Sequence, residues 1–219
     1  MSEDNYSLSS KVYHSIRNDI LSGKYMPGDE LKEKNIGDEL GVSRTPVREA
    51  LRQLDLEGLI SIVPNKGAFV EGVSLNDIRD IYEIRALLEG LCAKWAVDNI
   101  TDELMAEMEE NIYLSEFHES KGNKKQILLL DNRFHEILYE ASGSKELKKV
   151  LKDYHDYVGR VRQVTLAESN RAKNSVKEHK QICEAIKAKD AMMAQKYASD
   201  HINSSKENMK KLGWENLIK

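Results

Sequence analysis

The chain has 219 residues, of which 40% are hydrophobic, 32% charged and only 6% aromatic, and its formal net charge is −4. This length allows one large or two small domains, and the scarcity of aromatic residues and proline favours a largely helical protein. No apolar run approaches the roughly 20 residues that span a bilayer, and the polar, acidic N-terminus is not a secretory signal. The composition therefore excludes a membrane protein and predicts a cytoplasmic one, with Cys92 and Cys183 as reduced, buried thiols.

The N-terminal part of the chain predicts a helix-turn-helix. Apolar residues recur on one face over 8–21 and again over 31–40, so a helix is expected in each range. Gly41 closes the second helix, and a third helix follows within a few residues, with Pro46 in its first turn. Two short helices joined by a tight turn that contains glycine are typical of this motif.

Three arginines mark the third helix as the one that would enter DNA. Arg44, Arg48 and Arg52 are spaced at i, i+4 and i+8, which places them on one side, and another side carries the apolar residues Val47, Leu51 and Leu54. A guanidinium can bond guanine O6 and N7 together. Arg52 lies two turns from the N-terminal tip, so we expect a phosphate contact or an ordinary surface role for it. Because residues 1–75 hold nine Lys/Arg against twelve Asp/Glu, DNA binding must depend on local clustering of the arginines.

A β-hairpin is expected directly after this helix. Two runs rich in apolar and β-branched residues, within 57–64 and 65–70, flank an Asn-Lys-Gly turn. This hairpin would be a wing with Lys66 at its tip. The first 74 residues therefore predict a winged helix-turn-helix domain.

The remaining residues, 75–219, predict a larger helical domain. They contain no proline and no convincing strand. Polar and glycine-containing breaks divide them into six expected helices, over 75–98, 101–119, 124–142, 144–167, 170–188 and 190–211. The predicted fold class is therefore mainly α, with a three-helix winged domain followed by an all-α six-helix bundle.

Four polar residues lie at positions in this bundle where apolar residues are expected. Asp131 and His135 are spaced at i, i+4 on the third helix, while His179 and His201 align with the apolar faces of the last two. Burying them without partners would be costly, and one divalent metal would satisfy all four. For each histidine alone, an ordinary hydrogen-bonded place in the core is the alternative. The other histidines, His14, His118 and His155, fit no ligand set and are expected at the surface or beside a partner.

The winged domain resembles a known family in both order and spacing. SRTPVREALRQLDLEGLI followed by PNKGAFV is similar to the DNA-binding domain of the GntR family of bacterial transcription regulators. The resemblance implies a homodimer that places two recognition helices on a palindromic operator in double-stranded DNA. It further implies that Arg44 and Arg48 read bases or phosphates, that Thr45 contacts phosphate, and that Lys66 and Gly67 meet the neighbouring groove.

The helical domain also resembles part of this family. The patterns D-x-x-x-F-H and E-H-x-x-I-x-x-A-I-x-x-x-D, followed by a late histidine, are similar to the FCD effector domain of FadR-type regulators. The resemblance implies a divalent metal held by Asp131, His135, His179 and His201, with Zn, Ni, Mn or Fe all suited to such ligands. Six helices rather than seven suggest the shorter, VanR-like variety. Ser144 departs from the family, which commonly has Asn there.

Arg85 is a further polar residue on an apolar face. Its partner is either Glu89, one turn further on, or the carboxylate of a small organic acid, the kind of effector that the family commonly binds. Arg160 and Arg162 are weaker candidates for the same pocket.

The predicted function is therefore that of a metal- and acid-responsive transcription regulator, and repression is the commoner mode in the family. A purely structural metal is one alternative. A metal-dependent hydrolase is another, but the sequence offers no nucleophile motif, and an enzyme would not need a winged helix-turn-helix.

Overall fold

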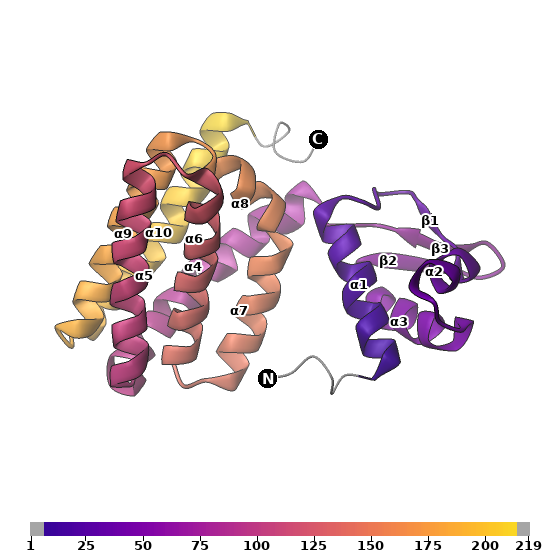
Figure 1. Cartoon of the computed structure of the whole chain (residues 1–219), viewed down its shortest axis with the longest axis horizontal. Helices are drawn as coiled ribbons and strands as arrows, with labels where there is room; N and C mark the ends of the chain where they lie inside the picture. Colours follow the sequence, from indigo (N-terminus) through magenta and orange to yellow (C-terminus); the bar gives the residue numbers. More distant parts are fainter. Residues whose placement is uncertain (1–6, 214–219) are drawn as a thin grey trace. The chain divides into compact units, whose positions relative to one another are not determined.

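The computed structural model describes residues 7–213, so the outermost parts of both predicted domains, 1–6 and 214–219, lie outside the described residues. The chain forms two compact units, 1–74 and 75–219. Figure 1 draws the smaller unit from indigo to magenta and the larger one onward to yellow. Each unit has its own core and is described by itself below.

The smaller unit combines helices with a short sheet. Within its described residues it holds α1 (Leu8–Ser22), α2 (Glu33–Leu40), α3 (Arg44–Leu56), β1 (Glu30–Leu31), β2 (Ile60–Val63) and β3 (Gly67–Val70). Its core is made by apolar side chains that recur at helical spacing and at alternate strand positions, among them Val12, Ile16, Ile20, Val47, Leu51, Leu54, Ile60 and Val70. The helix-turn-helix and the wing are therefore present in the order that the sequence predicts.

The sheet has one more strand than the predicted hairpin. Strands β2 and β3 pair antiparallel, and β1 pairs with the other edge of β3, giving the order β1-β3-β2. The helix expected over 31–40 consequently begins at Glu33, because Leu31 is used in this pairing. Between β2 and β3 the chain turns through Asn65 and Gly67, which have φ values of 61° and 121°. A side chain is strained at the second of these values, so a glycine is required where β3 begins.

The larger unit is entirely helical over its described residues and contains seven helices. They are α4 (Leu75–Asn99), α5 (Asp102–Ser120), α6 (Lys124–Ala141), α7 (Lys145–Tyr157), α8 (Gly159–Leu166), α9 (Ser169–Lys187) and α10 (Ala191–Leu212). Figure 1 shows α5, α6, α9 and α10 running roughly side by side. Buried residues of α4, α5, α6, α7, α9 and α10 form one core, with Phe134, Leu138, Ile182 and Ile186 among them.

The helix predicted over 144–167 is in fact two helices, α7 and α8. The chain leaves helical geometry at Val158, whose φ and ψ are −93° and 7°, and Gly159 begins the next helix. Val158 is fully buried, so the break lies inside the packed unit rather than in a surface loop. The predicted number of six helices is therefore one too low. The number of seven observed over the described residues removes the reason for assigning the domain to the shorter, VanR-like variety.

Two expectations from composition can be compared with this fold. No described helix is both long enough and apolar enough to cross a membrane. Cys92 and Cys183 are free and buried, as expected. Burial raises the pKa of these thiols to about 12 and about 11, so both are unreactive near neutral pH.

Candidate functional site

The predicted recognition helix, α3, presents its polar side to solvent. Pro46, Val47, Ala50, Leu51 and Leu54 are buried on its inner side. Arg44, Thr45 and Arg48 are all exposed. The i, i+4 spacing therefore separates a packing face from a free face, as the sequence indicates.

Arg48 is bound by an acidic residue of the preceding helix. Its Nε and Nη2 donate to Oε1 and Oε2 of Glu33 in α2, at 2.9 and 2.8 Å. The hydrogen bond from Arg48 lowers the pKa of Glu33. Both side chains remain accessible, at 57% for Arg48 and 31% for Glu33. A phosphate or base could therefore replace Glu33 without unfolding anything around it.

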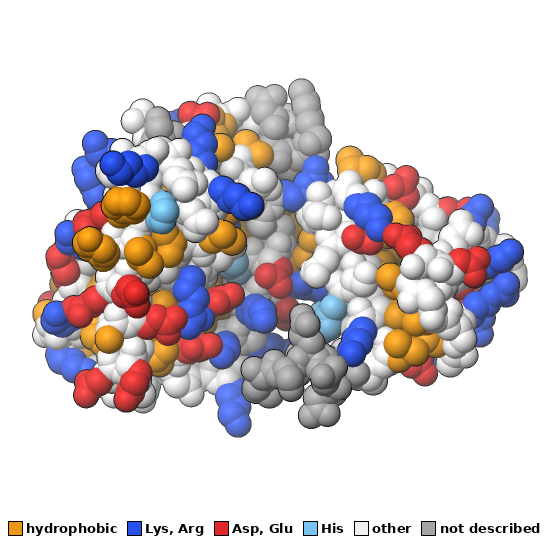
Figure 2. Space-filling view, in the orientation of Figure 1, with side chains coloured by type: hydrophobic (Ala, Val, Ile, Leu, Met, Phe, Trp, Pro, Cys, Tyr) orange, Lys and Arg blue, Asp and Glu red, His pale blue; other side chains and the backbone are white. Residues whose placement is uncertain are grey.

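The wing is the second exposed part of the smaller unit. Lys66 and Gly67 are exposed where the hairpin turns, while Ala68 and Val70 of β3 are buried. Figure 2 shows acidic and basic side chains interspersed over this unit, with Lys and Arg gathered along its outer edge. Basic side chains thus occur locally on a unit whose overall balance is acidic.

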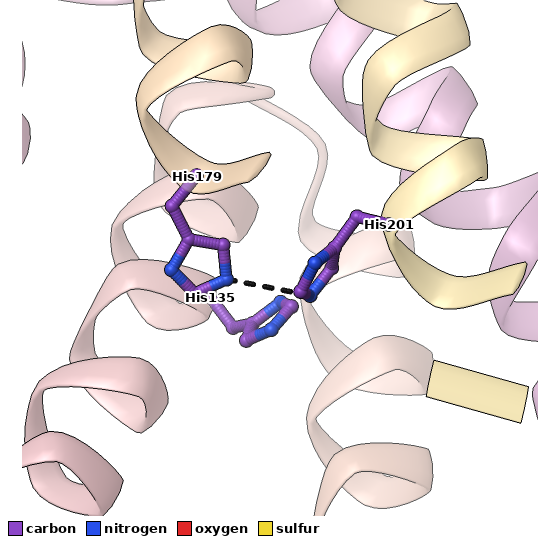
Figure 3. Close-up of side chains that lie close together, drawn as sticks. All are labelled: His135, His179 and His201. Carbon is purple, nitrogen blue, oxygen red and sulfur yellow. Dashed lines mark hydrogen bonds between the residues drawn. The ribbon is translucent and has the colours of Figure 1, made fainter. Parts of the chain in front are cut away.

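Three buried histidines of the larger unit converge on one point. His135 of α6, His179 of α9 and His201 of α10 each offer a ring nitrogen, and these nitrogens all lie within 4.8 Å of one another. Figure 3 shows the three rings turned toward each other, with His179 Nε2 and His201 Nε2 separated by 3.3 Å. The ring of His179 also stacks on Phe134, with centroids 3.8 Å apart. Three separate helices therefore hold the imidazoles in fixed positions.

Two glutamates lie against the outer ring nitrogens of His201 and His135. Glu178 Oε2 accepts from His201 Nδ1 at 2.7 Å. Glu89 Oε2 lies 2.9 Å from His135 Nδ1, but without the alignment of a hydrogen bond. The carboxylate of Glu178 on Nδ1 of His201 leaves Nε2 of that ring with the free lone pair, which is the usual arrangement around metal-binding histidines.

Asp131 lies beside the histidines, and other side chains already bond both oxygens of its carboxylate. Its Oδ1 is 3.7 Å from His179 Nε2 and accepts a hydrogen bond from Ser175 at 3.0 Å. Its Oδ2 accepts from Nη2 of Arg162 in α8. The structure therefore brings the three predicted histidines together and places Asp131 beside His179, while Arg162 binds the carboxylate on the side away from Ser175.

Arg85 is fully buried and bonds Glu89, so the first of its two predicted partners is present. Its Nε and Nη2 donate to Glu89 Oε1 at 2.9 and 2.5 Å, and the same oxygen accepts from the Tyr139 hydroxyl at 2.9 Å. Among the described residues, however, no group accepts from Arg85 Nη1. A buried guanidinium nitrogen without an acceptor is costly, and an added anion would satisfy it.

A small cavity of about 10 Å³, room for about one water molecule, lies among polar residues of the larger unit. Three arginines from three helices line it, namely Arg85, Arg162 and Arg171, together with Asp131, His135, His201, Ser175 and Ser205. Arg171 forms two hydrogen bonds with Glu178, at 3.0 and 2.8 Å, and a third with Ser205 at 2.9 Å. The lining of the cavity is charged and polar, so it suits a charged ligand rather than an apolar one, and a ligand larger than one water requires side chains to move.

Several residues of this site were not predicted from the sequence. Arg171, Ser175 and Glu178 share one stripe of α9, since they are spaced by four and three residues, and that periodicity could have revealed them. His155 was left without a role. It is buried, and its Nε2 accepts from Arg162 Nη1. Arg160, the other weak candidate, does not line the cavity.

The electrostatics of the cavity set the charge of each group. Burial would raise the pKa of Asp131, but the charge of Arg162 and the nearby imidazoles hold it well below its ordinary value. Burial also opposes ionisation of Glu89, yet Arg85 and then His135 keep its pKa well below the usual range. Burial lowers the pKa of His135, and burial together with His201 lowers that of His179 further. At neutral pH the carboxylates are thus ionised, and His135 and His179 are neutral.

This donor set fits a divalent transition metal. Neutral imidazoles and an ionised carboxylate are the protonation states that such ions require, and His135, His179 and Asp131 are in these states, with the ring of His201 beside them. A metal held there would supply positive charge and open coordination positions for an anion.

The fold now defines the class of protein. A winged helix-turn-helix with exposed arginines on its third helix, followed by a separate helical domain, is the architecture of a DNA-binding transcription regulator. Residues 8–70 match the family described as "Bacterial regulatory proteins, gntR family", and residues 80–204 match the FCD domain. The chain therefore belongs to the GntR family of transcription regulators, in the group that carries an FCD domain, as the resemblance implied.

Relatives that match nearly the whole chain are described as HTH-type transcriptional regulators. The HTH-type transcriptional regulator YdhC of Bacillus subtilis is 29% identical over 91% of this chain and 90% of its own length. The HTH-type transcriptional repressor RspR of Escherichia coli is 25% identical over 95% of this chain and 92% of its own. The solved structure of E. coli McbR/YncC, at 24% identity, has the same fold, with a TM-score of 0.75 over 95% of this chain and all of its own. The relatives are regulators rather than enzymes.

Proposed function

We propose that this transcription regulator senses a small carboxylate through a divalent metal held in its helical unit, and that the occupied unit changes how the winged helix binds DNA. The observation that carries the proposal is the convergence of three buried imidazoles beside a cavity lined by arginines. The metal would be held by Asp131, His135, His179 and His201. Arg85, with Nη1 free of any acceptor among the described residues, would bind the carboxylate.

DNA would be bound by the exposed face of the smaller unit. Arg44 and Arg48 would read bases or phosphates, Thr45 would contact phosphate, and Lys66 with Gly67 would meet the adjacent groove. A cytoplasmic homodimer would place two such faces roughly 34 Å apart on a palindromic operator. Repression is the mode we favour, since the relative RspR is described as a repressor. Effector binding would act by shifting the population between two dimer geometries.

The metal is tested by elemental analysis of tag-free protein from metal-replete cells. We expect about one divalent ion of Zn, Ni, Mn or Fe per chain, because four ligands saturate a single site. His179→Ala should lose the ion, whereas His118→Ala, which changes a histidine outside the cluster, should retain it. Wild-type protein that contains no metal would overturn the proposal.

The carboxylate is tested by a thermal-shift screen of small organic acids, run with and without chelator. We expect stabilisation by at least one acid that disappears when the metal is removed, because a bound ligand stabilises the folded state. A metal-loaded protein that responds to no acid would instead support a purely structural metal.

The DNA contacts are tested with a duplex that wild-type protein selects from a random library. Arg48→Ala should lower affinity by about tenfold or more, since a bidentate arginine contact is worth about 1–3 kcal/mol. Arg52→Ala is the matched control on the same helix, with a smaller expected effect. Unchanged affinity in Arg48→Ala would show that α3 is not used as proposed.

A further inference from the structure

Each of the three arginines that line the cavity bonds a carboxylate, but only one of these carboxylates is a candidate metal ligand. Arg85 is bound to Glu89 and Arg171 to Glu178, and both glutamates lie behind the histidines that they hold. Arg162 is bound to Asp131, which lies 3.7 Å from the nearest histidine nitrogen. Arg162 is therefore the one cavity arginine, among the described residues, whose partner carboxylate is also a candidate metal ligand.

Building on the proposed function, we propose that Arg162 and a divalent metal compete for Asp131, and that the guanidinium released in this exchange selects an effector with two carboxylates. Arg162 bonds Oδ2 of Asp131, whereas Oδ1, which also accepts from Ser175, is the oxygen that lies 3.7 Å from His179 Nε2. A cation on Oδ1 and the guanidinium on Oδ2 would therefore share the negative charge of one carboxylate. A cation that coordinates Asp131 withdraws the negative charge to which Arg162 is paired. A buried guanidinium that loses its counter-charge requires another anion.

The remaining contacts of Arg162 keep it at the cavity after such an exchange. Its Nη1 donates to Asn132 Oδ1 at 2.8 Å and also to His155 Nε2. Neither of these groups carries a negative charge, so they position the guanidinium without neutralising it. Burial, followed by the positive charge of Arg162, lowers the pKa of His155 well below its ordinary value, which keeps this neighbour neutral.

The charge balance of the cavity indicates how many negative charges the effector carries. Arg85, Arg162 and Arg171 are balanced by Glu89, Asp131 and Glu178, so the six residues together are neutral. A divalent cation adds two positive charges to this set. A dianion restores neutrality, whereas a monocarboxylate leaves one buried positive charge unpaired.

The positions of the arginines suit two carboxylates rather than one. Arg85 on α4 and Arg162 on α8 reach the cavity from different helices, and both line it. Arg85 offers Nη1, which has no acceptor within the described part of the chain. One carboxylate would therefore meet Arg85 beside the metal, while the other would meet Arg162. The cavity volume is about 10 Å³, room for about one water molecule, so an acid enters only where side chains such as Arg162 move aside, and it must be small.

The exchange is tested with Zn²⁺ as the metal and with succinate and butyrate as probes, which share a four-carbon chain but differ by one carboxylate. In chelated, tag-free wild type, calorimetry should show little succinate binding. After Zn²⁺ is added, succinate should bind at least tenfold more tightly than butyrate. Equal affinities for the two acids would overturn the proposal.

Arg162→Gln separates the two roles of this arginine. Zn²⁺ should bind it at least as tightly as wild type, because no ion pair at Asp131 has to be broken. Succinate affinity in the Zn²⁺-loaded variant should fall about tenfold to hundredfold, as expected for a lost charge-assisted hydrogen bond, while butyrate affinity stays the same. Arg160→Gln, on the same helix but outside the cavity, is the matched control and should behave as wild type. Weaker Zn²⁺ binding in Arg162→Gln would refute the competition.

Asp131→Asn tests the same exchange in the opposite direction, and its outcome does not depend on Arg162→Gln being folded. This variant removes the negative charge from the partner of Arg162 without adding metal. It should therefore bind succinate in the presence of chelator more tightly than wild type does, although it binds Zn²⁺ more weakly. No gain in metal-free succinate binding would contradict the proposal.

These outcomes are distinct from failure of the proposed function itself. If wild type binds neither Zn²⁺ nor any acid, the sensing function is wrong. If it binds Zn²⁺ and small acids but neither variant changes its preference, the sensing function stands and the role of Arg162 is wrong.

Discussion

The two units use the same pair of side chains in opposite surroundings. In the smaller unit Glu33 binds Arg48 on an exposed surface, with accessibilities of 31% and 57%. In the larger unit Glu89 binds Arg85 with both side chains only 1% accessible. An exposed pair contributes little to stability and can be exchanged for another partner, whereas a buried pair cannot be broken without leaving a charge stranded. Exposure therefore suits a surface that must meet DNA, and burial suits a site that must keep its shape.

The buried pair should show the largest effect when it is broken. Glu89→Gln leaves Arg85 charged and without a counter-charge in the core, so we expect the free energy of unfolding to fall by about 3–5 kcal/mol. Urea denaturation of the full chain measures this loss. Glu83→Gln is the matched control, since Glu83 lies on the same helix and bonds Lys206 at the surface. A change below about 1 kcal/mol in Glu89→Gln would mean that the buried pair is no more important than an exposed one.

A backbone change in the wing should have the next largest effect. Gly67 has a φ of 121°, and a Cβ there would lie 3.3 Å from Glu30 Oε1. Gly67→Ala should therefore destabilise the smaller unit by about 1–3 kcal/mol. Gly159→Ala provides the comparison in the larger unit, because a Cβ at that position meets nothing within 4 Å. Thermal unfolding of both variants distinguishes strain from a general intolerance of alanine.

The buried histidine beside Arg162 should give the larger unit a pH dependence. Burial, and then the charge of Arg162, lower the pKa of His155 well below its usual value. Between that lowered pKa and the ordinary value near 6.5, the unfolded chain binds a proton that the folded chain does not. The stability of metal-free protein should thus fall as the pH drops below 6.5.

His155→Asn removes this contribution, so its stability should depend less on pH, by up to ~1.4 kcal/mol per pH unit. Urea denaturation at a series of pH values between 7 and 5 measures the slope. His14→Asn, in the exposed part of α1, should retain the wild-type slope. Parallel curves for His155→Asn and wild type would exclude this histidine as the cause.

The exposed pair should give the smallest effect on stability and a gain in binding. Glu33→Gln should change the free energy of unfolding by less than about 1 kcal/mol. Because Arg48 then has no acidic partner to leave, affinity for the selected duplex should rise severalfold. Glu39→Gln removes the same charge from the same helix, but Glu39 binds Lys24 instead. Equal gains in both variants would attribute the effect to net charge rather than to the release of Arg48.

The sequence predicts local features well and contacts between helices poorly. The spacing of Arg44, Arg48 and Val47 correctly separated the two faces of α3, because helix periodicity is a local property. The inward positions of His135, His179 and His201 followed from the same periodicity. That Arg162 reaches Asp131 could not be derived, since it depends on how α8 lies across α6. The break at Val158 was missed because no proline marks it, although Gly159 offered a weak signal.

The break at Val158 has a consequence for how a signal could leave the cavity. Helix α8 has only eight residues, too few for a helix to be stable by itself in water, so its position depends on what its side chains contact. Its inward residues are Val161, Arg162, Thr165 and Leu166. If the residue or ligand that binds Arg162 changed, helix α8, which carries Arg162, would be able to take another position. In the proposed exchange, a change in the anion that Arg162 pairs with would therefore change the position of the whole of α8.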